Sequence, residues 1–146
     1  KRVMASSRAP ALYSTELLAL AIELADYPFD AAAPAIGHAR SRSCGSVIDL
    51  SSSGGSLEDL GLRVSACAVG QASAAIFARE SSGMNAAAIA AMVENLGEWL
   101  QDQAPSSILP RLELLEPARP HLGRHEAILL PWRAALDALS KTEAAR

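Results

Sequence analysis

The fold of this chain is decided by residues 44–70, CGSVIDLSSSGGSLEDLGLRVSACAVG, which contain both of its cysteines, Cys44 and Cys67. Apolar and polar residues alternate on both sides of the pair Gly54-Gly55, the pattern of two strands joined by a hairpin turn. Two glycines suit such a turn because they adopt positive φ angles without steric cost. The hairpin would bring the two thiols close together in space although 22 residues separate them in the sequence.

A further strand precedes this hairpin, and its polar character suits the edge of a sheet. The predicted strands are about Gly37–Arg42, Ser46–Ser51 and Leu60–Ala66. In the last of them every second residue is apolar, which indicates one buried face. We therefore predict the α+β class, with a three-stranded antiparallel sheet and helices packed mainly on one of its faces.

Helical periodicity surrounds these strand segments. Ser14 is a suitable N-cap for a first helix, Ala68–Glu80 is typical of a helix of small residues, and Asn85 is the N-cap of a third helix. The last helix is expected over about Ile128–Thr142, with a start that places Pro131 in the first turn, where proline is tolerated. The apolar stripe of the third helix consists of Ile89, Met92, Val93, Leu96 and Leu100.

Composition limits both the size of the fold and the partners it suits. A chain of 146 residues can bury a sizeable core, so we predict a single domain, 1–146, whose residues 1–10 form a mobile N-terminal segment. Half of the residues are apolar but only 4% are aromatic, so the core must consist of small and aliphatic side chains. With 13 basic and 16 acidic residues no basic face is expected, and nucleic acid is not an expected partner.

Neither a membrane segment nor an export signal is expected. No apolar run approaches the roughly 18–20 residues that cross a bilayer, and the polar start lacks the apolar segment of a signal peptide. Two cysteines without an export signal favour reduced thiols over a structural disulfide. We therefore expect a cytoplasmic protein without a membrane partner.

The two cysteines are the residues best suited to carry chemistry. Cys67 directly precedes a predicted helix, whose N-terminal N–H groups and dipole favour the thiolate that soft metals and electrophilic sulfur require. Free cysteine is also often a small buried hydrophobe, so both interpretations of Cys67 stay open. Cys44 stands before Gly45, which lets the backbone turn or approach a ligand closely.

A metal site would need donors beyond the two cysteines, since zinc takes four protein ligands, or three and a water. The candidates include His38, His121, His125 and Glu126, and each histidine can equally be an ordinary surface residue. His125-Glu126 is the most suggestive pair because it lies just before the last predicted helix. Sequence motifs of hydrolases, nucleotide-binding loops and metalloproteases are absent.

Taken together, these segments resemble the NifU-like family of iron–sulfur cluster scaffolds, which includes the IscU and SufU types. Leu12-Tyr13-Ser14 looks like the N-terminal element of that family, and Cys44-Gly45-Ser46 looks like its Cys-Gly-Asp strand entry. The run Val64–Ala74 is similar to its second cysteine segment, in which a cysteine opens a helix of small residues. The helix predicted from Asn85 to Leu100 matches the element that follows.

Two departures from the family pattern concern the ligands. The family has an aspartate two residues after its first cysteine, where this chain has Ser46. The third cysteine of the family lies just before the last helix, and that position falls on Ala127, or at best on Glu126. At most two of the three usual thiolates remain, and a serine hydroxyl is a poor ligand for iron.

The resemblance implies a protein that receives persulfide sulfur from a cysteine desulfurase, and iron, builds a [2Fe–2S] cluster and passes it to acceptor proteins. Zinc is an alternative to iron at such a site. A scaffold of this kind would not turn over a substrate as an enzyme does. The site residues that the resemblance implies are the ligands Cys44 and Cys67, the further donors His125 or Glu126, and the lining residues Gly45 and Ser46.

Three functions stay open at this point. The first is a variant scaffold that uses Cys44 and Cys67 together with a donor other than cysteine. The second is an accessory or regulatory homologue that keeps the fold and the partner surface without binding a cluster. The third is a thiol-redox module in which the two cysteines form a reversible disulfide.

Overall fold

The computed structural model describes residues 14–144, so the predicted mobile segment 1–10 and the pair Leu12-Tyr13 lie outside the described residues. Its centre is an antiparallel sheet in the order β1-β2-β3, in which β2 pairs with both neighbours. The strands are β1 Ala35–Arg40, β2 Val47–Ser52 and β3 Gly61–Ser65. The predicted three-stranded antiparallel sheet is therefore confirmed.

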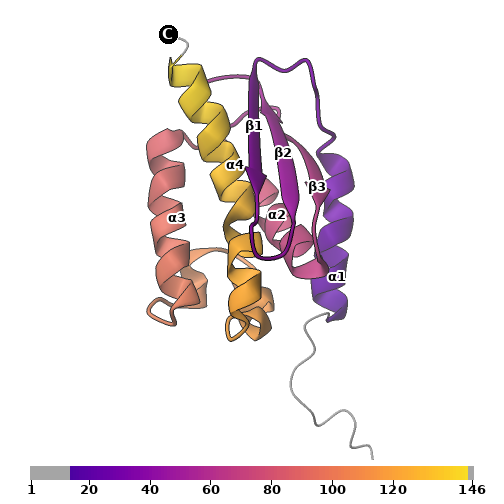
Figure 1. Cartoon of the computed structure of the whole chain (residues 1–146), viewed down its shortest axis with the longest axis vertical. Coiled ribbons are helices and arrows are strands. Elements are labelled where there is room, and N and C mark those ends of the chain that lie inside the picture. The colour runs from indigo at the N-terminus through magenta and orange to yellow at the C-terminus, as the bar shows by residue number, and fades with distance from the viewer. Residues whose placement is uncertain (1–13, 145–146) are drawn as a thin grey trace, which may run out of the picture.

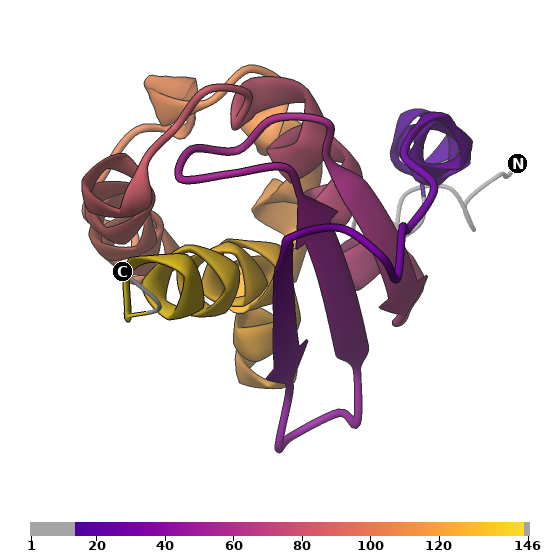
Figure 2. The same ribbon diagram turned by 90° about the horizontal axis from the view of Figure 1, so that it is seen from above.

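The helices lie mainly on one face of this sheet (Figure 1, Figure 2). The fourth helix, α4, packs against β1 and β2, while α2 packs against α4 and α1, and α3 lies on the outer side of α4. The predicted α+β class is thus confirmed, and among residues 14–144 no helix has the length and apolar character that crossing a membrane requires. The bounds are α1 Thr15–Ile22, α2 Ala68–Glu80, α3 Ala86–Leu100 and α4 His125–Ala144, with the 3₁₀-helices η2 Glu23–Asp26, η3 Ser106–Ile108, η4 Leu112–Ala118 and η5 Leu122–Arg124.

One hydrophobic core lies between the sheet and the helices. Ile48 and Leu50 of β2 are fully buried, whereas Asp49 between them is partly exposed, so the strand alternates as predicted. Phe77 of α2 and Trp132 of α4 meet edge to face, with ring centroids 4.9 Å apart and an interplanar angle of 83°. This aromatic pair joins the two helices that flank the candidate site, and α2 approaches α4 closely because most of its buried residues are small.

β1 ends at Arg40, two residues earlier than predicted, because the chain turns away from the sheet after it. The backbone N–H groups of Arg42 and Ser43 donate to one carboxylate oxygen of Glu126, at 2.9 and 3.2 Å, instead of continuing the ladder. This contact reaches across more than 80 residues of sequence, so strand periodicity could not reveal it. The other predicted strand ends move by one or two residues.

The connection between β2 and β3 differs from the predicted glycine turn. Its left-handed residue is Asp59, with φ of 50°, and neither Gly54 nor Gly55 has a positive φ. The loop is long, and the Ser53 N–H donates to the carbonyl oxygen of Glu58 at 3.0 Å. It also places the side chain of Leu57 in the core, 1% exposed, which a turn centred on the two glycines could not do.

α4 begins at His125, so Pro131 is its seventh residue and the predicted helix start is wrong. A proline at this position leaves the carbonyl oxygen of Ala127 without its helical N–H partner. In the same part of the helix the Ser73 hydroxyl of α2 donates to the carbonyl oxygen of Ile128 at 2.7 Å. This buried contact from a neighbouring helix stabilises the turn that proline weakens, and local sequence does not reveal it.

The predicted helix starts at Ser14 and Asn85 are confirmed. The Ser14 hydroxyl accepts a hydrogen bond from the N–H of Leu17 at 3.1 Å, and the Asn85 amide oxygen accepts one from the N–H of Ala88 at 2.9 Å. The predicted bounds of α2 are also those observed. On α3 the predicted stripe misses Trp99, which is completely buried.

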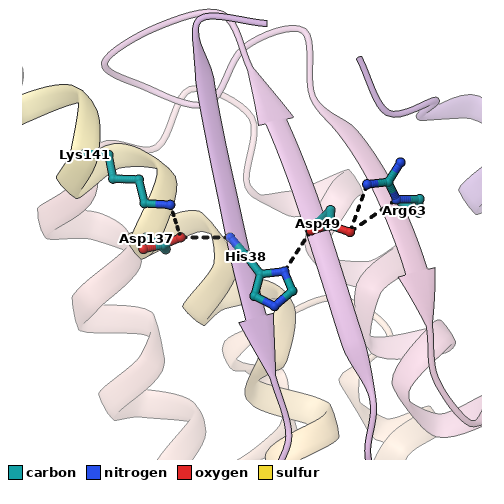
Figure 3. Close-up of polar contacts among 5 residues, drawn as sticks. All are labelled: His38, Asp49, Arg63, Asp137 and Lys141. Atoms are coloured by element: carbon teal, nitrogen blue, oxygen red, sulfur yellow. Dashed lines mark hydrogen bonds and ion pairs between the residues drawn. The ribbon is translucent and has the colours of Figure 1, made fainter. Parts of the chain in front are cut away.

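α4 also covers the outer edge of β1 (Figure 3). The backbone N–H of His38 donates to Asp137 Oδ2 at 2.9 Å, and Lys141 pairs with the same oxygen. On the open face of the sheet, His38 Nδ1 and Arg63 Nε contact the Asp49 carboxylate at 2.8 and 3.2 Å. The hydrogen bond from His38 lowers the pKa of Asp49, burial raises it, and Arg63 lowers it further, so that the pKa lies below its usual range.

Candidate functional site

The two cysteines approach each other at one end of the sheet. Cys44 lies in the turn between β1 and β2, and Cys67 follows β3 as the N-cap residue of α2. Val47 at the start of β2 pairs with Ser65 at the end of β3, so antiparallel pairing brings the two thiols to the same end. Both are free thiols, and they line one hollow of about 300 Å³ together with Gly45, Ser46, Ser65, Ala66 and Arg124.

The backbone of the turn depends on Gly45. Its φ is 73°, in the left-handed region that glycine adopts without strain. The Gly45 N–H donates to the carbonyl oxygen of Ser41 at 3.3 Å, and the Ser41 N–H donates to the carbonyl oxygen of Ser46 at 2.8 Å. These two bonds close the hairpin and hold Cys44 at its tip, where the thiol is exposed.

The sulfur of Cys44 lies between two serine hydroxyls. Its Sγ is 3.2 Å from Ser41 Oγ and 3.0 Å from Ser46 Oγ. Burial raises the pKa of the Cys44 thiol, whereas hydrogen bonds from Ser41 and Ser46 and the charge of Arg124 lower it by more. The resulting pKa lies below the ordinary value, which favours the thiolate.

Of the two hydroxyls, Ser46 is the better donor to a thiolate. Ser41 has one hydroxyl proton, which it can donate either to the Cys44 thiolate or to Glu126 Oε1, 2.9 Å away. While Ser41 holds this bond, it can only accept from the protonated thiol of Cys44. Ser46 is 4% exposed and free of that competition, so its hydroxyl can turn toward the sulfur.

Glu126 acts on the turn that carries Cys44 and does not line the hollow. Its Oε1 accepts hydrogen bonds from the Ser41 hydroxyl, from the N–H groups of Arg42 and Ser43, and from the Ser43 hydroxyl. The bond from Ser41 lowers the pKa of Glu126 most, and the backbone bond from Ser43 lowers it next. The carboxylate proposed from sequence as a further metal donor is therefore engaged, through one oxygen, with backbone and hydroxyl groups.

Cys67 is half-buried at the start of α2. It has an extended backbone, with φ −67° and ψ 172°, and its side chain makes no capping hydrogen bond to the helix. The carbonyl oxygen of Cys67 accepts the N–H of Gln71 at 2.9 Å, which starts the helical ladder. The thiol thus stands beside the N-terminal N–H groups of a 13-residue helix, as the sequence pattern indicated.

The remaining candidate donors lie elsewhere. Ala127, at the position of the third family cysteine, is 1% exposed, and a Cβ added to Gly70 would lie 3.5 Å from the Ala127 methyl group. His125 Nε2 lies 2.7 Å from the carbonyl oxygen of Arg119 and lines a different hollow. His38 lies on the open face of the sheet, where it contacts Asp49.

Arg124 is the site residue that sequence reasoning missed. It ends η5, immediately before α4, and is the charged member of the residues that line the thiol hollow. Its Nε is buried and has no hydrogen-bond partner among the described residues. Arginine donates hydrogen bonds but ligates no metal, so a pattern of candidate metal donors such as His125-Glu126 does not include it. The sequence indicated Arg124 only through its position directly before His125-Glu126, the pair considered as further metal donors.

The donor set does not by itself fit a complete [2Fe–2S] cluster. Such a cluster takes four ligands, and in this hollow the chain supplies two thiolates. Among residues 14–144 no group of three or more His, Cys, Asp or Glu side chains is arranged to hold a metal ion. A cluster or metal bound here would need further ligands from outside the described residues, whereas a persulfide would need only one thiolate.

Comparisons with known proteins identify the fold. No protein-family model matches the chain, and no curated protein matches it significantly. A NifU-like protein (N-terminal) from Brucella abortus, described as nitrogen-fixing, is similar with a TM-score of 0.76 and 27% identity, over 92% of this chain and 96% of that one. A putative iron–sulfur cluster assembly scaffold protein for the SUF system from Fervidobacterium islandicum has a TM-score of 0.75 and 18% identity, over 88% and 96%.

A third solved structure, of a hypothetical protein, has a TM-score of 0.69 and 20% identity, over 86% of this chain and 97% of that one. Each likeness spans most of both chains, so the whole arrangement of sheet and helices is shared. The resemblance stated from the sequence is confirmed by these structures.

Proposed function

We propose that this chain, whose structure is similar to NifU-like and SUF-system scaffold proteins over most of its length, is a scaffold-like protein of iron–sulfur cluster assembly. Cys44 and Cys67 hold its cargo, which is a [2Fe–2S] cluster, iron or persulfide sulfur, and zinc can take the place of iron. The observation that carries this proposal is that both free thiols line the same hollow. Thiolates are the ligands that iron–sulfur clusters and zinc prefer.

Persulfide sulfur suits this site best among the three cargoes. The Cys44 thiolate attacks the terminal sulfur of a donor persulfide, the donor S–S bond breaks, and the donor cysteine leaves as a thiolate. This transfer needs one exposed, easily ionised thiol, which describes Cys44. Cys67, half-buried at the helix start, then serves as the second sulfur ligand when iron is present.

The partners of this function are a cysteine desulfurase as sulfur donor and cluster-acceptor proteins as recipients. The cytoplasm is the setting in which both thiols stay reduced. The protein carries its cargo and does not turn over a substrate as an enzyme does. Of the two further donors proposed from sequence, Glu126 contributes by fixing the turn that carries Cys44, whereas His125 lines a different hollow.

Anaerobic reconstitution with iron and sulfide tests the proposal. With a small thiol in the buffer to supply the missing ligands, we expect the wild type to develop the charge-transfer absorbance of a cluster with matching acid-labile sulfide, and Cys44→Ser and Cys67→Ser to lose both signals. The control is the double variant Cys44→Ser/Ser53→Cys, which keeps two thiols but moves one to the other end of β2, about 20 Å away. Equal loading of this control and the wild type would overturn the proposal.

A thiol-redox module is the second candidate, and the two free thiols in one hollow favour it. In that case the wild type would form a reversible Cys44–Cys67 disulfide in a redox titration and would take up neither iron nor sulfide. If it took up neither and formed no disulfide, the accessory homologue that only contacts partner proteins would remain.

A further inference from the structure

The thiol hollow contains one cationic side chain, Arg124. Arg124 lines it beside Cys44 and Cys67, and the other lining residues are glycine, serine and alanine, which carry no charge. Arg124 reaches this place because η5 ends immediately before α4. The electrostatic potential in the hollow is therefore set by one guanidinium and by the two sulfur atoms.

No carboxylate of the described residues pairs with this guanidinium. The ion pairs of residues 14–144 use Asp49, Glu23, Asp102 and Asp137 as their acids. Glu126, two residues away in sequence, directs one oxygen to the turn at Ser41–Ser43. A partly buried guanidinium without an internal anion has donors available for an external one.

We propose that the thiol hollow binds a small sulfur compound that bears a carboxylate, with the carboxylate on Arg124 and the sulfur at Cys44. The inference rests on the proposed function, because it names the class of sulfur compound that the same two thiols receive. Arginine recognises carboxylates through paired, planar hydrogen bonds, which lysine cannot reproduce.

The size and the chemistry of the hollow both favour a small molecule. A volume of about 300 Å³ is at the lower end of the range of small-ligand pockets. A thiol compound of this class would also supply one of the external sulfur ligands that the incomplete donor set requires. Arg124 thus selects the compound by its charge. A thiol of this class lies beside Cys44 as a second metal ligand, whereas in a disulfide or persulfide the Cys44 thiolate attacks one sulfur, the S–S bond breaks and the other sulfur leaves as a thiolate.

Thiol–disulfide exchange with charged probes tests this inference without any metal. In the exchange, the Cys44 thiolate attacks one sulfur of the probe, the probe S–S bond breaks, and the other half leaves as a thiolate. The anionic probe is 5,5′-dithiobis(2-nitrobenzoate), and the cationic probe is cystamine. Second-order rate constants are measured for both probes in the Cys67→Ser background, where Cys44 is the only thiol of the chain.

Arg124→Gln should lower the ratio of the rate with the anionic probe to the rate with cystamine by about 3- to 10-fold. A change in thiolate fraction would alter both rates by the same factor, so the ratio of the two rates isolates the charge of Arg124. Arg124→Lys should keep most of the ratio. The matched control is Arg133→Gln, which removes an exposed arginine nine residues further along the chain, on α4, and should change neither rate.

Equal slowing with both probes, or no change with either, would overturn the inference. If Arg124→Gln does not fold, the wild-type rates decide the matter, because added salt should slow the anionic probe and speed up cystamine. This result is separate from the test of the proposed function. A protein that fails to take up iron and sulfide but keeps the charge selectivity would contradict only the scaffold role.

Discussion

The sulfur of Cys44 is held by two serines whose roles differ. Ser46 is buried and free to donate to the thiolate, whereas Glu126 competes with the thiolate for the proton of Ser41. The position at which the family resemblance expects an aspartate thus carries a hydroxyl 3.0 Å from the sulfur of Cys44. At the scale of the residue, the site is built to keep a thiolate.

Replacing Ser46 tests this role directly. Ser46→Ala removes a hydrogen bond to the thiolate, so the pKa of Cys44 should rise and its alkylation by iodoacetamide at neutral pH should slow. The measurement is the pH dependence of the alkylation rate in the Cys67→Ser background. Ser65→Ala is the control, because Ser65 lines the same hollow without contacting the sulfur. If Ser46→Ala has the same pH dependence of alkylation as the parent protein, the Ser46 hydroxyl does not stabilise the thiolate.

The lowered pKa of Glu126 predicts that the stability of the protein depends on pH. Its pKa is lower in the folded protein than in the unfolded chain, so the contribution is present above the ordinary carboxyl pKa and is lost as pH falls through the folded-state pKa. Wild type should therefore exceed Glu126→Gln in stability near pH 7, and the difference should vanish in acid. Urea unfolding at several pH values measures it, with the exposed Glu94→Gln as control. A difference that stays constant over this range would contradict the argument.

At the scale of the element, α4 determines how the site is assembled. It covers the edge of β1, carries Glu126 to the turn of Cys44, and begins directly after Arg124. β1 approaches α4 closely at Gly37, where an added Cβ would lie 2.0 Å from the carbonyl oxygen of Ala134. No rearrangement of a side chain could relieve that overlap, because the opposing atom belongs to the backbone of α4.

Two glycine substitutions should therefore have opposite effects. Gly37→Ala forces β1 away from α4 and should cost about 3 kcal/mol or more in the free energy of unfolding. Gly97→Ala, in α3 with open space around it, should stabilise by about 0.5–1 kcal/mol, since alanine favours helix. Chemical denaturation measures the free energies of unfolding of both variants and of the wild type. Equal stabilities of the two variants would show that α4 does not pack on β1 in this way.

Local signals predicted the elements well, and the failures all depend on distant contacts. The caps Ser14 and Asn85 and the bounds of α2 follow from neighbouring residues, so sequence sufficed. Local sequence did not predict the start of α4, because Pro131 is accommodated inside a helix that a neighbouring helix supports. Local sequence did not predict the loop after β2 either, because the conformation of this loop depends on the burial of Leu57 in the core.

At the scale of the whole molecule, the site too has parts that local sequence predicts and a part that depends on distant contacts. Strand alternation predicted that the two cysteines lie near each other, and the hollow that both of them line also includes Gly45 and Ser46, which the family resemblance suggested as lining residues. Local sequence could not reveal Arg124, since only the folded chain brings the start of α4 to the hollow beside the turn. The likeness to scaffold proteins over most of the chain gives this two-thiol site its proposed setting.

The composition of the protein purified without oxygen tests the central claim most directly. Iron, zinc, acid-labile sulfide and cyanide-reactive sulfane sulfur are measured in the wild type and in the double variant Cys44→Ser/Cys67→Ser. Our account predicts that the wild type carries sulfane sulfur, or metal with or without labile sulfide, and that the double variant carries none of them. A wild type as empty as the double variant would contradict it.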